Sequence, residues 1–199
     1  IRTGQLVTAM RQNNRGLEIA ELAVRHRDNG VVGFDIAGPE KGFMPANHKA
    51  AFEYLAEHLF PVTVHAGEGD GVASIRDAIV SGRALRLGHG VRLIEDVMFS
   101  RSEGDTDVVV LGEVAEWVHD RGIALELSPS SNLQTGAISM LGETLSDHPF
   151  DILYELGFKV TVNTDNRLMS RTTLTRELEL LMSTFGYSLA DLEQFQLNA

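Results

Sequence analysis

Apolar residues along this chain gather in six short runs, separated by longer stretches whose apolar residues recur with helical spacing. The short runs predict β-strands over Gln5–Met10, Val31–Ala37, Val62–His65, Leu85–His89, Ile123–Leu127 and Lys159–Asn163. The longer stretches predict helices over Arg15–Asp28, Asn47–Leu59 (capped by Asn47), Val72–Ser81, Val108–Arg121, Pro149–Leu156, Thr172–Phe185 and Leu189–Leu197. Strands and helices therefore alternate along most of the chain.

Nearly all-apolar strands that alternate with helices indicate a parallel sheet covered by helices, which is the α/β class. A doubly wound open sheet and a closed TIM (β/α)8 barrel both allow this pattern. Polar residues follow nearly every strand, which favours the barrel over an open sheet with one switch point. The length of 199 residues is short for a complete barrel. We therefore expect residues 1–199 to form a single partial barrel domain with about six of the eight strand–helix units, lacking those at its N-terminus.

The composition narrows the range of partners. The formal net charge of −11, without a cluster of Lys or Arg, argues against nucleic acid. No run approaches the ~20 apolar residues of a membrane span and no signal peptide opens the chain, so we expect no membrane partner. Because the chain has no cysteine, a metal must take His, Asp or Glu ligands, and this composition fits a reducing cytoplasm.

Three predicted strands lead into residues that can bind a metal or move a proton: His65 with Glu68 three residues later, His89, and Asp165. The chemistry of a barrel lies at the C-terminal ends of its strands, so we expect these side chains to converge there. His65 and Asp165 are candidate zinc ligands. Glu68 could pass a proton, and His89 could orient an attacking water molecule or act as a base. Gly38 would let a flat ligand approach a backbone N–H closely.

Several strings, in order along the whole chain, resemble those of the adenosine deaminases: DIAGPE, VHAGEGDG, GRALRLGHGV, ELSPSSNLQTGA, HPF and VTVNTDNRLMS. Those enzymes are zinc barrels of the metal-dependent amidohydrolase superfamily. The resemblance implies hydrolysis of adenosine and 2′-deoxyadenosine to inosine and ammonia in purine salvage, with one Zn2+ per intact site. It implies that His65 and Asp165 bind zinc, that Glu68 donates a proton to purine N1, and that His89 handles the attacking water. The Gly38 amide would hold purine N3.

Two features depart from the family pattern. The HxH pair that supplies two zinc ligands is absent from the sequence, so we expect a fragment with half of the metal shell that is inactive by itself. The family's Asp-Asp pair is Asp165-Asn166 here, and the Asn166 amide could still form a hydrogen bond with a purine. The RLMS string that follows resembles the bacterial members and favours adenosine as the substrate.

Other interpretations of these residues stay open. The chain could belong to a deaminase of another aminopurine, adenine or a modified adenosine, or it could be a catalytically inactive fragment or binding module. Asp165 could simply cap a helix, and the glycines of HAGEGDG could suggest a phosphate loop, although its carboxylates would repel phosphate. Ser130, Ser131 and Asn132 could support the pocket or cap a helical turn.

Overall fold

The computed structural model describes residues 3–101 and 107–199, and the chain divides into two compact units, Ile1–Gly88 and His89–Ala199. All six strands that the apolar runs predict are present. They are β1 (Gln5–Met10), β2 (Val31–Ala37), β3 (Thr63–Ala66), β4 (Arg86–His89), β7 (Ala124–Leu127) and β8 (Val160–Val162). The first two match their predicted bounds, and the others are shorter by one or two residues or shifted by one.

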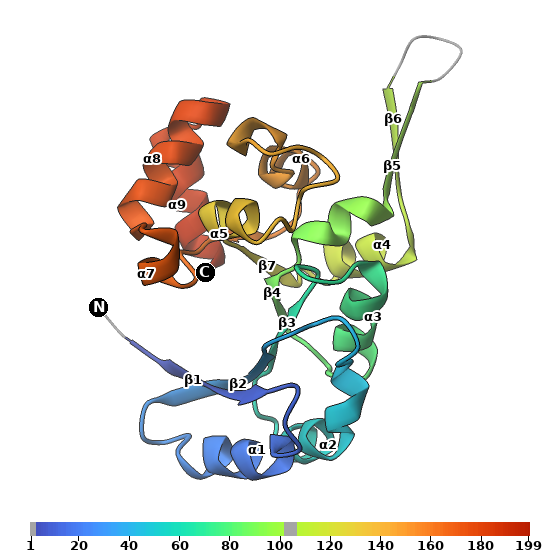
Figure 1. Cartoon of the computed structure of the whole chain (residues 1–199), viewed down its shortest axis with the longest axis vertical. Coiled ribbons are helices and arrows are strands. Elements are labelled where there is room, and N and C mark those ends of the chain that lie inside the picture. Colours follow the sequence, from blue (N-terminus) through green and yellow to red (C-terminus); the bar gives the residue numbers. More distant parts are fainter. Residues whose placement is uncertain (1–2, 102–106) are drawn as a thin grey trace. The chain divides into compact units, whose positions relative to one another are not determined.

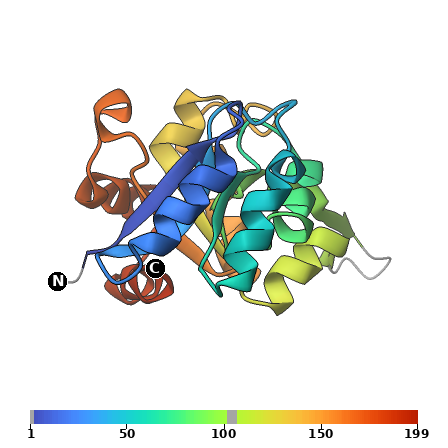
Figure 2. The same ribbon diagram turned by 90° about the horizontal axis from the view of Figure 1, so that it is seen from below.

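In Ile1–Gly88, parallel strands alternate with helices. β1 and β2 form a parallel pair, and Phe34 of β2 forms a parallel bridge with Val62, just before β3. The connections are α1 (Gly16–Arg25), the 3-10 helix η1 (Pro45–His48) followed by α2 (Lys49–Glu57), and α3 (Val72–Val80). Figures 1 and 2 show α1 and α2 lying along one face of the β1–β2 pair. This unit therefore has the strand–helix–strand order that the sequence predicts.

The core of this unit contains small side chains from α1 and large aromatic side chains from α2 and β2. Ala20 and Ala23 are the fully buried residues of α1, which contacts α2. Phe52 of α2 meets Phe34 of β2 edge-to-face, with ring centroids 6.1 Å apart, and both side chains are buried. Burial of an aromatic side chain of this size stabilises a fold by about 2 kcal/mol, so this contact fixes α2 on the sheet.

In His89–Ala199, β7 and β8 form a parallel pair in which Leu125 to Leu127 oppose Val160 to Val162. The helices after β8 are α7 (Arg167–Ser170), α8 (Leu174–Phe185) and α9 (Leu189–Asn198), and α6 (Phe150–Glu155) precedes it. An aromatic cluster joins α6 to α9, with the rings of Phe150 and Phe195 fully buried and 5.1 Å apart. The remaining segments are η2 (Val91–Asp96), α4 (Glu113–Asp120), α5 (Pro129–Gln134) and η3 (Leu145–Asp147).

The prediction of one helix over Val108–Arg121 is wrong in its first part. A strand, β6 (Asp107–Leu111), pairs antiparallel with β5 (Val97–Arg101) as a hairpin, and α4 begins only at Glu113 (Figure 1). Successive valines favour the extended backbone. Asp96 then accepts hydrogen bonds from the backbone N–H groups of Val114 and Ala115 and starts the helix there.

Asn47 does not cap a helix, which is a second correction. It lies inside η1, and α2 begins after that turn, with His48 in the N-cap position. His48 is itself buried, and its Nε2 lies 2.9 Å from the Arg11 carbonyl oxygen. Across the described residues, none of the helices is both long and apolar enough to cross a membrane.

Candidate active site

His65 lies near the C-terminal end of β3, and a buried carboxylate holds its imidazole. Asp35 of β2 places Oδ2 2.8 Å from His65 Nδ1, and its Oδ1 accepts a hydrogen bond from the His65 backbone N–H at 3.2 Å. The Asp35 side chain is only 3% exposed. Carboxylates that contact one ring nitrogen in this way orient a metal-binding histidine through the other. The contact with Asp35 occupies the Nδ1 side of the ring and leaves Nε2 as the nitrogen of His65 that could bind a metal.

The loop that carries Glu68 is held by a second buried carboxylate, Glu40. Its two oxygens accept hydrogen bonds from three successive backbone N–H groups, those of Gly67 (2.6 Å), Glu68 (3.0 Å) and Gly69 (2.7 Å). Hydrogen bonds to an ionised acceptor are roughly twice as strong as neutral ones. Glu40 thus fixes the backbone beneath Glu68, whose half-buried side chain is the candidate proton donor.

A buried cation, Arg11, lies near these two carboxylates. The Arg11 guanidinium donates to the His65 carbonyl oxygen at 2.6 Å, and the residue is 2% exposed. Burial lowers the pKa of Arg11, while the nearby Glu40 and Asp35 carboxylates act in the opposite direction. Gly88 closes the other side of His65, because a Cβ there would lie 2.9 Å from Nδ1. Within Ile1–Gly88, His65 therefore lies next to a negative charge (Asp35), a positive charge (Arg11) and the backbone of Gly88.

In His89–Ala199, the two candidate residues share an uncommon backbone conformation. His89 and Asp165 have φ of +65° and +49°, in the left-handed region that residues with a Cβ rarely adopt. Such strain of about 1–3 kcal/mol per residue concentrates at functional sites. His89 Nε2 lies 4.0 Å from Asp165 Oδ2, so this unit brings these two predicted residues together.

Neighbouring side chains of α5 hold both residues. Ser131 donates its hydroxyl proton to Asp165 Oδ2 at 2.6 Å, and Asn132 Nδ2 lies 2.9 Å from His89 Nδ1. These contacts favour the pocket-supporting interpretation of Ser131 and Asn132. The alternative role of Asp165 as a helix cap is wrong, because Asn166 is the N-cap of α7 and accepts from the Met169 N–H at 3.3 Å.

Gly38 follows β2 with φ of +111°. This positive φ strains any residue with a Cβ, and a Cβ here would also come within 2.6 Å of Gln12 Oε1, so that the Gln12 side chain would have to move. The exposed backbone of Gly38 is compatible with the close approach of a ligand.

Asp35, Glu40, Arg11 and His148 support the site without having been predicted from the sequence; His148 does so through Asn132, whose Oδ1 lies 3.2 Å from His148 Nε2. Asp35 could have been predicted, because a charged residue in the otherwise apolar strand VVGFDIA is unusual and indicates a specific partner. The others follow strands or precede a proline, where polar residues are common.

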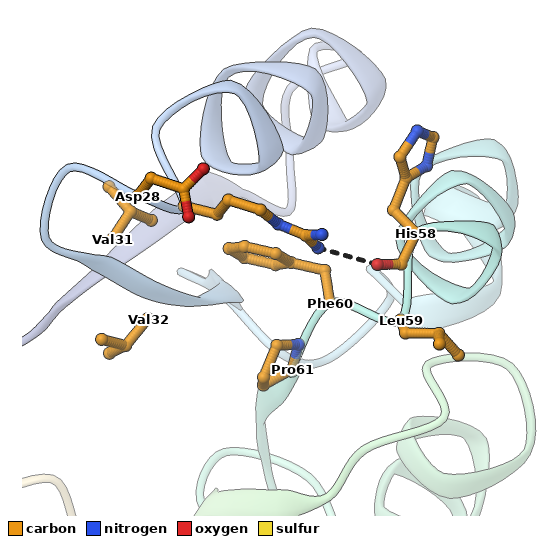
Figure 3. Close-up of a pocket in the computed structure, with 8 residues that line it drawn as sticks. Asp28, Val31, Val32, His58, Leu59, Phe60 and Pro61 are labelled. Atoms are coloured by element: carbon orange, nitrogen blue, oxygen red, sulfur yellow. Dashed lines mark hydrogen bonds between the residues drawn. The ribbon is translucent and has the colours of Figure 1, made fainter.

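A pocket of about 460 Å³ lies elsewhere in Ile1–Gly88, where β2 begins and the chain enters β3 (Figure 3). Arg27 crosses it, with its guanidinium 5.4 Å from the centroid of the Phe60 ring and donating to the His58 carbonyl oxygen at 2.7 Å. It is lined by none of the candidate residues. Features at the N-terminal ends of barrel strands serve stability, so we assign this pocket no catalytic role.

The donor atoms fit a metal ion that takes nitrogen and oxygen ligands. His65 would offer Nε2 with its Nδ1 directed at Asp35, and Asp165 would offer a carboxylate oxygen with its Oδ2 held by Ser131. Zinc accepts both ligand types and depends on such supporting contacts.

Solved structures define the class of fold. The adenine deaminase of Arthrobacter aurescens superposes with a TM-score of 0.82 at 21% identity, covering 98% of this chain and 54% of that one. An amidohydrolase of Burkholderia ambifaria with bound Zn gives a TM-score of 0.77 at 23% identity, covering 96% of this chain and 49% of that one. The likeness confirms the predicted α/β fold of the amidohydrolase barrel type, with the barrel incomplete in this chain, which covers about half of each solved structure.

The sequence comparisons define the family. The adenosine deaminase of Mycobacteroides abscessus is 52% identical over 199 residues, which is 100% of this chain and 53% of that protein. The chain spans about half the length of the curated relatives it matches. The Adenosine deaminase family profile matches residues 1–199. The chain belongs to the adenosine deaminase family.

Proposed function

We propose that the whole protein hydrolyses adenosine and 2′-deoxyadenosine to inosine and ammonia with one zinc ion per site, in purine salvage in the cytoplasm. The observation that carries this proposal is the 52% identity to an adenosine deaminase over the whole chain. The supported side chains of His65, Glu68, His89 and Asp165 agree with it, because each lies at or just after the end of a strand.

In this proposal, His65 and Asp165 are two of the zinc ligands. A bound zinc ion would lower the pKa of a water molecule towards ~7 and so provide a nucleophile. Glu68 donates a proton to purine N1, which removes the charge that would otherwise build up on the ring during attack. The Glu40 contact supports this role, because it restrains the backbone of Glu68 while the carboxyl group itself stays half-buried.

Gly38 and Asn166 are proposed to bind the base. The Asn166 Oδ1 already accepts the Met169 N–H, so the amide NH2 is the group directed to a ligand. An amide NH2 donates a hydrogen bond without first having to be protonated, unlike a carboxylate. Asn166 would therefore suit an acceptor such as purine N7, and the Gly38 N–H would suit purine N3.

A second candidate is a deaminase of another aminopurine. The fold likeness to an adenine deaminase is the observation that favours it. The much higher identity to an adenosine deaminase favours adenosine as the substrate. Steady-state rates of the whole protein with adenosine, adenine and N6-methyladenosine separate the candidates, and a kcat/KM for adenine or N6-methyladenosine above that for adenosine would overturn our choice.

Replacing the proton donor tests the reaction itself. In the whole protein, Glu68→Gln should lower kcat by about 10² to 10⁴-fold, because an amide cannot deliver the proton. Metal content and thermal stability should match those of the wild type. Glu21→Gln, at an exposed position on α1, is the matched control and should keep full activity. A near-normal rate in Glu68→Gln would remove Glu68 from this role.

A further inference from the structure

A chain of buried polar groups runs from His89 to the backbone of α6. Asn132 Nδ2 lies 2.9 Å from His89 Nδ1, and His148 Nε2 lies 3.2 Å from Asn132 Oδ1. The Phe150 N–H donates to His148 Nδ1 at 3.1 Å. His89, Asn132 and His148 are all at most 3% exposed. Water therefore has little access to these contacts, and the groups must satisfy one another.

The direction of each hydrogen bond follows from groups that can act in only one way. A backbone N–H only donates, so His148 Nδ1 accepts from Phe150 and the proton of neutral His148 is on Nε2. That Nε2–H donates to Asn132 Oδ1. The Ser128 backbone N–H donates to the same oxygen at 3.3 Å, so two independent donors fix the orientation of the amide. The Asn132 NH2 group can then only donate, and His89 Nδ1 must accept.

We propose that Asn132 and His148 are positioning residues that select the tautomer of His89, placing the proton of its neutral imidazole on Nε2. In a functional histidine, the hydrogen bond made by one ring nitrogen commonly determines whether that nitrogen or the other one carries the proton. Here the Phe150 N–H fixes the tautomer of His148, His148 fixes the orientation of the Asn132 amide, and that amide fixes the tautomer of His89. Burial lowers the pKa of His148 to about 3, with the nearby His89 acting in the same direction, so His148 stays neutral and keeps its direction.

The tautomer separates the two roles that the sequence leaves open for His89. A nitrogen that already carries a proton donates a hydrogen bond and cannot take a proton from water. His89 Nε2 faces Asp165 at 4.0 Å, on the side where we place the metal ligand. His89 would thus orient the attacking oxygen as a donor instead of acting as its base. This consequence rests on the proposed function, whereas the tautomer does not.

The test is a direct measurement of protonation in the whole protein labelled with 15N-histidine. Long-range 1H–15N spectra distinguish a protonated ring nitrogen from a bare one, and a His89→Gln variant assigns the His89 signals. We expect a bare Nδ1 and a protonated Nε2 for His89 and for His148. Asn132→Asp places an acceptor-only carboxylate against both rings, so His89 should move its proton to Nδ1. Asn198→Asp, at an asparagine that instead contacts Val160 O, is the matched control and should change neither ring.

A conservative substitution distinguishes positioning from general support of the fold. His148→Gln keeps an NH2 donor for Asn132 Oδ1 and should preserve the His89 tautomer, whereas His148→Leu should lose it. With adenosine, Asn132→Asp should lower kcat by about tenfold or more and change KM much less. A proton on Nδ1 of His89 in the wild type, or an unchanged tautomer in Asn132→Asp, would overturn the proposal. Failure of the whole protein to deaminate adenosine would instead overturn the proposed function and leave the tautomer result standing.

Discussion

In Ile1–Gly88 buried charges support the candidate residues, whereas in His89–Ala199 neutral groups contact them. Asp35 faces His65, and Glu40 binds the loop of Glu68 with Arg11 nearby. By contrast, a hydroxyl contacts Asp165 and an amide contacts His89. Charged acceptors bind strongly but take any donor, so they fix position. Neutral groups bind more weakly, but each has a defined donor and acceptor end, so they also fix where a proton lies.

Charged and neutral supports should also respond differently when a partner is removed or the pH changes. A buried carboxylate is stable only while it keeps its donors and counter-charge, so removing either partner is costly. A neutral network avoids that desolvation penalty but requires every member to keep its protonation state. We therefore expect the first region to be sensitive to loss of a charge and the second to be sensitive to acid.

Acid should produce the largest effect, through His148. An unfolded histidine takes up a proton near pH 6.5, whereas burial holds the pKa of His148 at about 3 in the folded protein. Between these values the unfolded state binds more protons, so stability falls as the pH falls. Below both pKa values the loss amounts to roughly 5 kcal/mol. Urea unfolding of the whole protein at several pH values measures it.

The control for this prediction is His148→Gln, which cannot titrate and keeps a donor for Asn132. Carboxylates titrate in both proteins, so the difference between their two pH profiles isolates His148. The variant should lose less stability between pH 6.5 and pH 3. Parallel profiles would show that His148 is protonated in the folded protein without penalty.

Loss of the Glu40 charge should come next. Glu40→Ala leaves three neighbouring backbone N–H groups without their acceptor. At about 1 kcal/mol or more for each, the free energy of unfolding should fall by about 3 kcal/mol. Glu57→Ala, at an exposed position at the end of α2, should leave stability unchanged. If the two variants lose stability equally, the Glu40 contacts do not hold the loop.

The sequence predicted the strands well because their signal is local. Buried parallel strands are apolar on both faces, so each appears as a short continuous run bounded by turns. The hairpin of β5 and β6 was missed for a related reason. Its valines also fit a helical stretch, and only pairing with Val97–Arg101 decides that they form a strand.

The candidate residues could be predicted from their places after the strands, but most of their supports could not. Ser131 and Asn132 are near a strand end and were recognised as possible supports. His148 reaches His89 through Asn132 from 59 residues away in sequence, a relationship that only tertiary structure creates. Glu40 accepts hydrogen bonds from backbone N–H groups, and because nearly every residue has one, the sequence does not show which of them it binds.

Removing the charge beside His65 should weaken metal binding more than stability. Asp35→Asn keeps the shape of the side chain but loses the negative charge 2.8 Å from Nδ1. Supporting contacts of this kind are worth about 10- to 100-fold in metal affinity, and we expect the upper end of that range for a buried charge. Zinc titration of the whole protein against a chelator measures the change. Asp28→Asn, at an exposed aspartate, is the matched control, and equal affinities in the two variants would contradict the role of Asp35.

Ser131→Ala should have the smallest effect on zinc affinity. The group that contacts Asp165 is a neutral hydroxyl, whereas the group that contacts His65 is a charged carboxylate. The substitution removes one hydrogen bond of 2.6 Å and leaves Asp165 one-third exposed to water, which can replace the lost donor. We expect zinc affinity to fall by about tenfold, or about 1.4 kcal/mol. Ser130→Ala is the matched control, since the neighbouring serine contributes its backbone N–H to Glu177, and the substitution keeps that group. A loss in Ser131→Ala as large as in Asp35→Asn would break the contrast between the two regions, because the hydroxyl would then matter as much as the charge.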